Sequence, residues 1–239
     1  MPTATAAMTL PFAEAVRARR SVRSFQPTPL SPSDIRAVLE DAQAAPSNCN
    51  TQPWNVHVVS GPTRDGLSKE LIKADVEGRY SLDFTFDYAD FGEGIYRERL
   101  HDFGATLAQY TGLKREDRQA RTEAARFGLE FFGAPHAAFL FMPTFGDNVR
   151  AGGDMGMYGQ NFLLSLAARG FAGVPQTHLG FFADTVRAFL DVPEDFKLMY
   201  GISFGYADET APVNTARTRR APLEQSVTLH DTPDVLDAP

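Results

Sequence analysis

The sequence has 239 residues, a formal net charge of −7 and one cysteine. This length suits one domain of ordinary to large size or two small ones. The acidic balance argues against general nucleic-acid or anionic-membrane binding, which favours a broad basic face. No apolar run approaches the roughly 20 residues that span a bilayer. The N-terminus lacks the basic start and apolar core of a signal peptide, and a lone cysteine indicates a reducing setting, so we expect a cytoplasmic protein.

Apolar spacing and the positions of Pro and Gly predict the elements in chain order. A loose leader is expected over residues 1–10. Helices are predicted over residues 12–20, 31–45, 61–77, 95–110, 116–130, 154–169 and 181–190. Strands are predicted over residues 54–60, 135–144 and 197–204, with residues 170–182 a loop or short extended piece and 225–229 a possible strand in a C-terminal tail, 225–239. The strands do not alternate cleanly with helices, so residues 1–239 are expected to form one α+β domain rather than a doubly wound sheet.

Residues 80–94 are rich in aromatic and acidic side chains and contain no basic residue. They show no helical stripe, and we interpret them as a long loop with short helical or extended pieces. Their aromatic rings can pack against the body or a partner subunit. Alternatively, the loop forms a lid or wall of a binding cavity, because long ordered loops in compact domains are often functional.

Two short segments concentrate arginine in an otherwise acidic chain. The first, RARRSVRSF (residues 17–25), holds four arginines, and the second, RTRR (residues 217–220), holds three. Guanidinium groups match phosphate oxygens in pairs, so two such segments brought together would form a phosphate clamp. The alternative is two unrelated solvated basic patches.

Several familiar motifs are missing from the sequence. No G-x-G-x-x-G follows a strand, which argues against a Rossmann dinucleotide fold, and there is no phosphate-binding G-x-x-x-x-G-K-[ST] loop. The five histidines are scattered and no cysteines are paired, so no metal site is predicted. Cys49 is interpreted as a small loop residue rather than a nucleophile.

Five segments in order resemble the FMN-dependent nitroreductase family. They are RRSVRSF (19–25), APSNCNTQPW (45–54), FFGAP (131–135), GISFGYAD (201–208) and RTRRAPLE (217–224). Residues 96–118 resemble the branch that reduces nitrobenzoates and other nitroarenes.

The resemblance implies a nitroreductase-like fold, a central and mostly antiparallel sheet flanked by helices. It implies a homodimer with FMN at the subunit interfaces and a C-terminal tail that extends onto the partner. NADH or NADPH would give a hydride to flavin N5, and a nitroaromatic or quinone-like acceptor would then take its place, in ping-pong order. The alternatives are a reductive dehalogenase, an enone reductase, or a non-catalytic flavin-binding protein.

The same resemblance assigns site residues by position. The phosphate clamp would comprise Arg19, Arg20, Ser21, Arg23, Arg217 and Arg220, with Arg219 an alternative in register. The flavin ring and ribityl chain would contact Pro46, Ser47, Asn48, Asn50 and Gln52 of the neighbouring subunit. The stretch Pro175, Gln176 and Thr177 would supply backbone N–H groups to the N5 edge, with Gln176 and Thr177 nearest to it. No side chain is expected to act as a nucleophile. These donors and acceptors suit a flavin, which needs a cationic cradle and amide groups around its ring.

The sequence departs from the family pattern at one place. Family members often carry an Asn just before FFGAP, whereas this chain has Gly128 and Glu130 in that region. Ring recognition on that side would then differ or pass to Arg126. Arg17 matches no family position and is expected to be a solvated helix residue.

Overall fold

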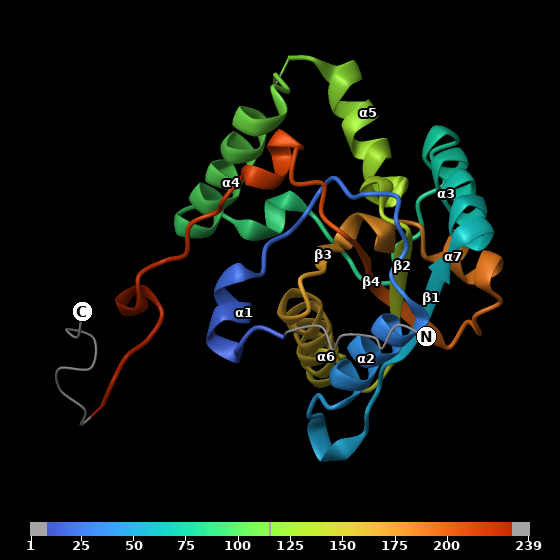
Figure 1. Ribbon diagram of the computed structural model, residues 1–239, viewed down its shortest axis with the longest axis horizontal. Helices are drawn as coiled ribbons and strands as arrows, with labels where there is room; N and C mark the ends of the chain where they lie inside the picture. Colours follow the sequence, from blue (N-terminus) through green and yellow to red (C-terminus); the bar gives the residue numbers. More distant parts are fainter. Residues whose placement is uncertain (1–8, 115, 231–239) are drawn as a thin grey trace, which may run out of the picture.

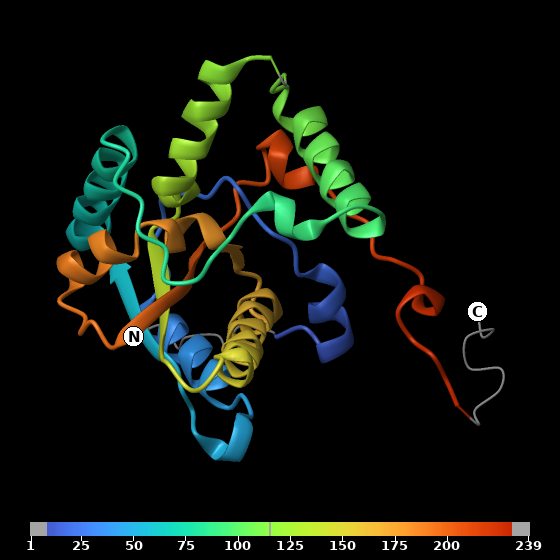
Figure 2. The same ribbon diagram turned by 180° about the vertical axis from the view of Figure 1, so that it is seen from behind.

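The computed structural model describes residues 9–114 and 116–230, and four of its strands form one antiparallel sheet (Figures 1 and 2). The strands are β1 (Asn55–Ser60), β2 (His136–Pro143), β3 (Ala172–Gln176) and β4 (Phe196–Gly205). Their order in the sheet is β1-β2-β4-β3, and each neighbouring pair runs antiparallel. The α+β fold with a central antiparallel sheet, predicted from the sequence, is therefore confirmed.

Helices cover both faces of this sheet. One face packs against α2 (Pro32–Gln43) and α6 (Val149–Ala168), whereas the other packs against α3 (Gly61–Val76), α5 (Arg118–Leu129) and α7 (Ala183–Leu190). The short α1 (Phe12–Ala18) lies against α6, and α4 (Ile95–Thr111) lies beside the 3₁₀ turn at Pro212–Thr215. Figure 1 shows α4 and α5 forming an arm that rises away from the sheet.

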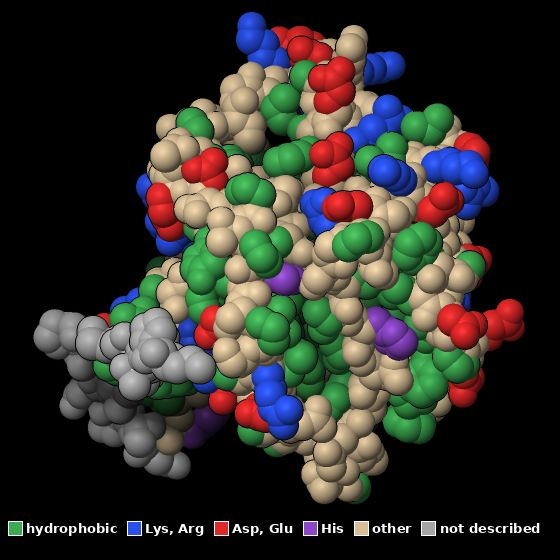
Figure 3. Space-filling view, turned by 45° about the vertical axis from the view of Figure 1, so that its right-hand side comes forward, with side chains coloured by type: hydrophobic (Ala, Val, Ile, Leu, Met, Phe, Trp, Pro, Cys, Tyr) green, Lys and Arg blue, Asp and Glu red, His purple; other side chains and the backbone are tan. Residues whose placement is uncertain are grey.

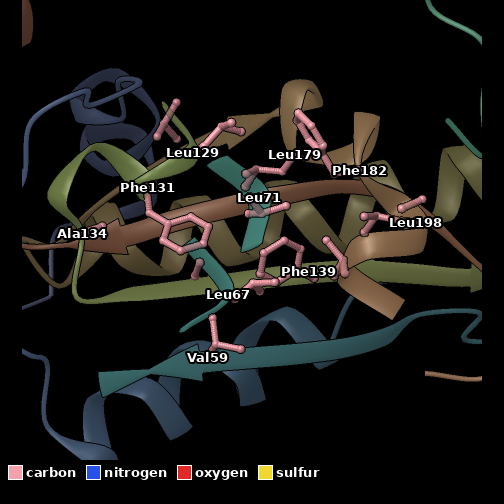
Figure 4. Packing of buried hydrophobic residues seen from close by; sticks show 14 of the residues in the cluster. Val59, Leu67, Leu71, Leu129, Phe131, Ala134, Phe139, Leu179, Phe182 and Leu198 are labelled. Atoms are coloured by element: carbon pink, nitrogen blue, oxygen red, sulfur yellow. The ribbon is translucent and has the colours of Figure 1, made fainter. Parts of the chain in front are cut away.

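The core divides along the sheet because neighbouring residues of a strand point to opposite faces. In β2, Phe139 and Phe141 belong to the cluster under α3, α5 and α7, which Figure 4 shows, whereas Leu140 and Met142 belong to the cluster under α2 and α6. All four side chains are fully buried. Both faces of the strand are covered, which is why its sequence is an unbroken apolar run.

A bulge in β4 changes which of its side chains face each cluster. The pairing with β2 shifts between Leu140 and Phe141, so that Leu140 lies opposite Tyr200 while Phe141 lies opposite Leu198. One extra residue on β4 reverses the side on which the later side chains fall. As a result Leu198 packs into the first cluster and Ile202 into the second.

Several of the predicted elements differ from the structure. Residues 172–176, expected to be a loop or short extended piece, form the strand β3. This strand lies at the edge of the sheet. Pro175 is tolerated there because its missing N–H removes no hydrogen bond between two interior strands. The helix expected from 154 begins at Val149, because Ala151 already packs into the core. The helix expected to reach residue 20 ends at Ala18.

The possible strand at 225–229 is wrong. The structure has a short 3₁₀ turn at Leu223–Gln225 followed by an exposed, irregular chain. No described strand lies beside this segment to pair with it. Most of the expected loose leader and the end of the expected tail, residues 1–8 and 231–239, lie outside the described residues. In the part of the chain that the structure describes, no helix combines the length and the apolar character needed to cross a membrane.

His136 is a buried polar group that joins β2 to two other segments. Its Nε2 accepts the backbone N–H of Leu30 at 2.9 Å, and its Nδ1 lies 2.6 Å from the hydroxyl of Ser60. A ring nitrogen that accepts a backbone N–H carries no proton, so the imidazole is neutral in the fold. Burial also lowers the pKa of His136 below its usual value.

This arrangement predicts a pH-dependent stability. Because the folded-state pKa of His136 is depressed, its contribution is present above the unfolded value of about 6.5 and is lost as the pH falls through the folded value. The free energy of unfolding should therefore decline below pH 6.5, with a slope of up to about 1.4 kcal/mol per pH unit from this group. Urea denaturation at pH 7.5, 6.5 and 5.5 measures it. The H136Q variant should show a shallower slope, and an equal slope in both proteins would contradict the assignment.

Candidate functional site

The first arginine segment runs extended beside β3. Ser21 forms an isolated bridge with Gly173, and Phe25 forms another with Ala207, just beyond the end of β4. Val22 and Phe25 are buried in the core, which fixes the segment to the body of the protein. The segment is therefore held in place, although no long ladder of hydrogen bonds includes it.

The second arginine segment folds back onto the first. The backbone N–H of Arg23 donates to the side-chain oxygen of Asn214 at 2.8 Å, across 191 positions of sequence. Arg217 donates in turn to the main-chain oxygen of Asn214 at 2.9 Å. Arg19 and Arg220 are near enough that the charge of Arg220 contributes to the pKa of Arg19. The interpretation of the arginine segments as two unrelated patches is wrong.

The electrostatics of this cluster favour an anion. Burial, and then the charge of Arg220, lower the pKa of Arg19, and burial lowers that of Arg23. The guanidinium of Arg23 lies 5.5 Å from the ring centre of Phe103 on α4. Among the described residues, none forms a salt bridge with Arg19, Arg23, Arg217 or Arg220. Arg19 and Arg23 are partly buried, whereas Arg217 and Arg220 are exposed. Guanidinium groups without a carboxylate partner stabilise a bound phosphate or carboxylate.

Arg20 is in a different position from its neighbours. Its guanidinium pairs with Glu209 at 2.6 Å, so it is already engaged by a carboxylate. A cavity of about 210 Å³ lies beside Arg19 and Arg20 and is otherwise lined largely by apolar side chains such as Leu163 and Phe171. Cavities that enclose a cofactor are usually about 300–1,000 Å³, so this one is too small to hold a whole dinucleotide or flavin nucleotide.

The polar loop at residues 46–52 is held by hydrogen bonds and is largely exposed. The backbone N–H of Asn48 donates to the buried carboxylate of Asp154 at 3.0 Å, and the hydroxyl of Ser47 accepts the N–H of Gln52 at 2.9 Å. Asn50 and Gln52 have φ values of +55° and +47°, a region that side chains other than Gly adopt at some cost. The side chains of Asn48, Asn50 and Gln52 remain exposed. Ser47 shapes the loop. The Gln52 side chain donates to the carbonyl of Asn50 at 3.3 Å, and the three exposed amides keep further donor and acceptor atoms for a ligand.

The end of β3 alternates exposed and buried residues. Pro175 and Thr177 are exposed, whereas Gln176 is buried. The Gln176 side chain donates to the carbonyl of Gly128 at 2.8 Å and accepts a hydrogen bond from Ser203. Its amide therefore fixes the local backbone. Arg126, two residues before Gly128 on α5, forms a salt bridge with Asp75 at 2.8 Å.

The arginine cluster and the polar loop lie at opposite ends of α6. The loop is tied to Asp154 near the start of this helix, and the cavity beside the arginine segment is lined by Ala167 near its end. Thirteen residues of helix separate the two, about 20 Å at 1.5 Å per residue. Figure 1 shows the loop at the bottom of the view, between α2 and β1, well away from the segment after α1.

The acidic and aromatic loop, residues 80–94, is anchored beside the end of β3. The buried carboxylate of Asp83 pairs with Arg187 of α7 and accepts the N–H of Leu198 at 2.7 Å. The ring of Phe86 lies 5.6 Å from that of Phe181, four residues after Thr177. The loop thus contains a short bridge at Ser81 and a 3₁₀ turn at Tyr88–Phe91, as expected for short extended and helical pieces.

Among the described residues no group of three or more His, Cys, Asp or Glu is arranged to hold a metal ion.

Comparison with known proteins identifies the family. Residues 16–206 match the nitroreductase family. The chain belongs to this family. Nitroreductase NfnB of Mycolicibacterium smegmatis is 44% identical over 230 residues, which cover 95% of this chain and 97% of the relative. A 4-nitrobenzoate reductase of Pseudomonas putida is 33% identical, with 90% and 93% covered.

Solved nitroreductases share the fold. The crystal structure of the FMN-dependent nitroreductase NfnB from Mycobacterium smegmatis in complex with NADPH aligns with a TM-score of 0.88 and 43% identity, covering 92% of this chain and 98% of that one. The FMN and NADPH-dependent nitroreductase NfnB from Sphigopyxis sp. strain HMH aligns with a TM-score of 0.89 and 30% identity, covering 93% and 100%. The nitroreductase-like fold predicted from the sequence motifs is confirmed.

Two residues of this nitroreductase site were missed by sequence reasoning. Asn214 connects the two arginine segments, and Phe103 lies under the guanidinium of Arg23. Asn214 precedes the second segment by three residues, but an Asn in a Pro-rich stretch is equally typical of a turn. Phe103 lies on a helix with few buried residues and carries no local signal. Only the tertiary arrangement reveals either one.

The Asp83–Arg187 pair predicts that replacing Asp83 with Ala costs much more unfolding free energy than replacing Asp184. Arg187 also pairs with Asp184, which is 73% exposed, whereas Asp83 is 7% exposed. D83A leaves a buried guanidinium without its buried partner and should lower the free energy of unfolding by about 3–5 kcal/mol. D184A removes a solvated partner and should cost about 0–1 kcal/mol. Urea denaturation of both variants measures the difference, and equal losses would mean that Asp83 does not anchor the loop.

Proposed function

We propose that this protein is an FMN-dependent oxidoreductase that uses NADPH or NADH to reduce nitroaromatic acceptors. The observation that carries the proposal is the convergence of Arg19, Arg23, Arg217 and Arg220 from the two ends of the chain, without a carboxylate partner in the described part. The relatives named above support it, because two are FMN-dependent and one reduces 4-nitrobenzoate.

The residues present suit the flavin phosphate. Guanidinium groups donate paired N–H bonds to phosphate oxygens, and the hydroxyl of Ser21 adds a donor in the same segment. The exposed amides of Asn48, Asn50 and Gln52 offer both donors and acceptors, which the uracil-like edge of a flavin needs. Bound FMN would supply hydride and electron transfer between the nicotinamide and the acceptor.

The chain's own contribution is binding and orientation. The backbone after β3 would supply N–H groups to the ring at Gln176 and Thr177, with the buried Gln176 amide holding that backbone in place. The acidic and aromatic loop would flank the acceptor, since it packs on Phe181 of the 3₁₀ segment that follows. Quinones share the flat, electron-poor character of nitroarenes and would fit the same surroundings.

We further propose that the protein works as a homodimer in which each flavin site uses the arginine cluster of one subunit and the polar loop of the other. The distance of about 20 Å along α6 between these two parts supports this arrangement. An exposed apolar groove of about 950 Å³ between α2 and the edge strand β1, on the side viewed in Figure 3, offers a surface for a second copy.

The described part of the C-terminal tail also suits a partner. It extends away from the body in Figures 1 and 2 and carries the exposed apolar side chains of Leu223, Val227 and Leu229. Contiguous exposed apolar side chains mark interaction surfaces. The tail would extend onto the partner subunit.

The first test is flavin binding and reduction. The purified protein should bind FMN, lose the visible flavin absorption on anaerobic addition of NADPH, and regain it on addition of 4-nitrobenzoate or nitrobenzene. R23A should weaken FMN binding by at least about tenfold, because one charge-assisted contact is worth roughly 1.5–3 kcal/mol. R17A serves as the matched control, because within residues 9–114 and 116–230 the Arg17 side chain bonds only to its own helix, at Ala13.

Three results would contradict the proposed function: no FMN binding, no bleaching by NADPH, or equal FMN affinity in R23A and the wild type. Bleaching without reoxidation by the nitroarenes, but with reoxidation by a quinone, would contradict the proposed acceptor alone. Repeating the reduction with NADH ranks the two donors.

The second test mixes subunits. R23A damages the arginine cluster, and N48A truncates the polar loop while keeping the backbone bond from residue 48 to Asp154. Each homodimer should bind FMN weakly. A purified R23A–N48A heterodimer, isolated through two different affinity tags, should bind about half the wild-type amount of FMN, because one of its two sites is built from two intact halves. If both halves came from one chain, neither site would be intact and the heterodimer would bind as weakly as the homodimers.

A further inference from the structure

Asn214 occupies a buried junction between the two ends of the chain. Its side chain belongs to the 3₁₀ turn Pro212–Thr215 and is only 2% exposed. The side-chain oxygen accepts the N–H of Arg23 at 2.8 Å, and the side-chain nitrogen donates to the carbonyls of Ser24 at 2.8 Å and Asp208 at 2.9 Å. All three bonds are to backbone, so the amide fixes the course of two separate segments.

Asn214 lies where the backbone pairing between residues 24–26 and residues 206–208 ends. Residues 24–26 pair with residues 206–208 through the bonds Gln26 N–H to Tyr206 and Asp208 N–H to Ser24, at 2.9 and 3.0 Å. Beyond Ser24 toward the N-terminus, and beyond Asp208 toward the C-terminus, the chains diverge toward the arginines. Asn214 bonds to Ser24 and Asp208 at this point and so extends the connection as far as Arg23.

The same residue reaches the second arginine segment through its main chain. The carbonyl of Asn214 accepts the guanidinium of Arg217 at 2.9 Å, and Arg217 also bonds to the carbonyl of Ala216 at 3.0 Å. One residue therefore fixes the backbone of Arg23 and the side-chain position of Arg217. Among side chains of this size, an amide alone offers both an acceptor and two donors in this arrangement; Asp lacks the donors and Leu lacks both.

We infer that Asn214 is a positioning residue that sets the spacing between Arg23 and Arg217 and thereby gives the site its preference for FMN over riboflavin. The inference rests on the proposed function. Like-charged guanidinium groups repel each other, and the two segments have no covalent link near this point. Truncation of Asn214 leaves the backbone N–H of Arg23 without its partner and removes one of the two hydrogen bonds to each of the carbonyls of Ser24 and Asp208, which favours separation of the segments. The phosphate contacts then weaken, while the contacts to the flavin ring remain.

Riboflavin is the probe that isolates this effect, because it has the ring and ribityl chain of FMN but no phosphate. Dissociation constants for FMN and riboflavin are measured by fluorescence quenching with apoprotein of the wild type and N214A. We expect N214A to lower the FMN-to-riboflavin affinity ratio by at least about tenfold, one lost charge-assisted contact, with riboflavin affinity within about twofold of wild type. N214S, whose hydroxyl can serve one of the three backbone groups, should change the ratio in the same direction and replaces N214A if that variant does not fold.

Two controls separate positioning from general loss of stability. N161A makes the same chemical change on α6, where Asn161 bonds to the carbonyl of Asp41 at 3.4 Å. L67A opens a cavity in the buried cluster beneath α3 and lowers thermal stability. Neither should change the FMN-to-riboflavin ratio.

The outcomes are distinguishable from those of the proposed function. A wild type that does not bind FMN would overturn both. A wild type that binds FMN, with N214A or N214S keeping the wild-type ratio, would overturn the positioning role alone. An equal fall in FMN and riboflavin affinity would also overturn it, because a merely structural residue acts on both ligands alike. A fall in the ratio confined to the Asn214 variants supports it.

Discussion

Four positively charged side chains from opposite ends of an acidic chain are held together by neutral hydrogen bonds rather than by carboxylates. Arg19 and Arg220 are near enough for their charges to interact, and Arg23 and Arg217 are bonded to the same asparagine. Such a cluster costs electrostatic free energy in the absence of an anion. Its persistence requires rigid surroundings, which the buried segment at Val22 and Phe25 provides. The rest of the molecule provides a fixed surface against which residues 19–25 pack.

That surface is the edge of the sheet formed by β3 and β4, with α6 packed behind it. Alternating apolar side chains of β2 and β4 fill both cores, and the bulge in β4 sets which of its side chains face each one, so helices cover both faces of the sheet. α6 then has a second role beyond burial. Its length separates the polar loop, tied to Asp154, from the arginine cluster by about 20 Å. This separation along a rigid helix is the reason why we propose that a second subunit supplies the polar loop to each arginine cluster.

The sequence was sufficient for features encoded locally and insufficient for those created by tertiary contact. The buried strand at residues 136–143 and the long helices were predictable because apolar spacing follows secondary structure directly. β3 was not, since Gly173 and Pro175 weaken the strand signal and only its edge position makes them acceptable. The two arginine segments were recognisable in the sequence, but the role of Asn214 in joining them was not. A single Asn in a sequence looks the same whether it forms a turn or a buried hydrogen-bonded link between segments.

The loop at residues 80–94 shows how a charge pattern can mislead about chemistry. Its aspartates read as an acidic surface, yet Asp83 is buried against Arg187, and Asp87 and Asp90 cap the same 3₁₀ turn by reciprocal bonds to its backbone. Carboxylates occupied in this way contribute structure rather than free charge. The outward character of the loop is instead aromatic, since Tyr88 is 60% exposed and Phe91 is 39% exposed. Packing against the body and flanking a cavity are therefore compatible, because Phe86 packs inward while its neighbours present flat apolar faces of the kind that suit an aromatic acceptor.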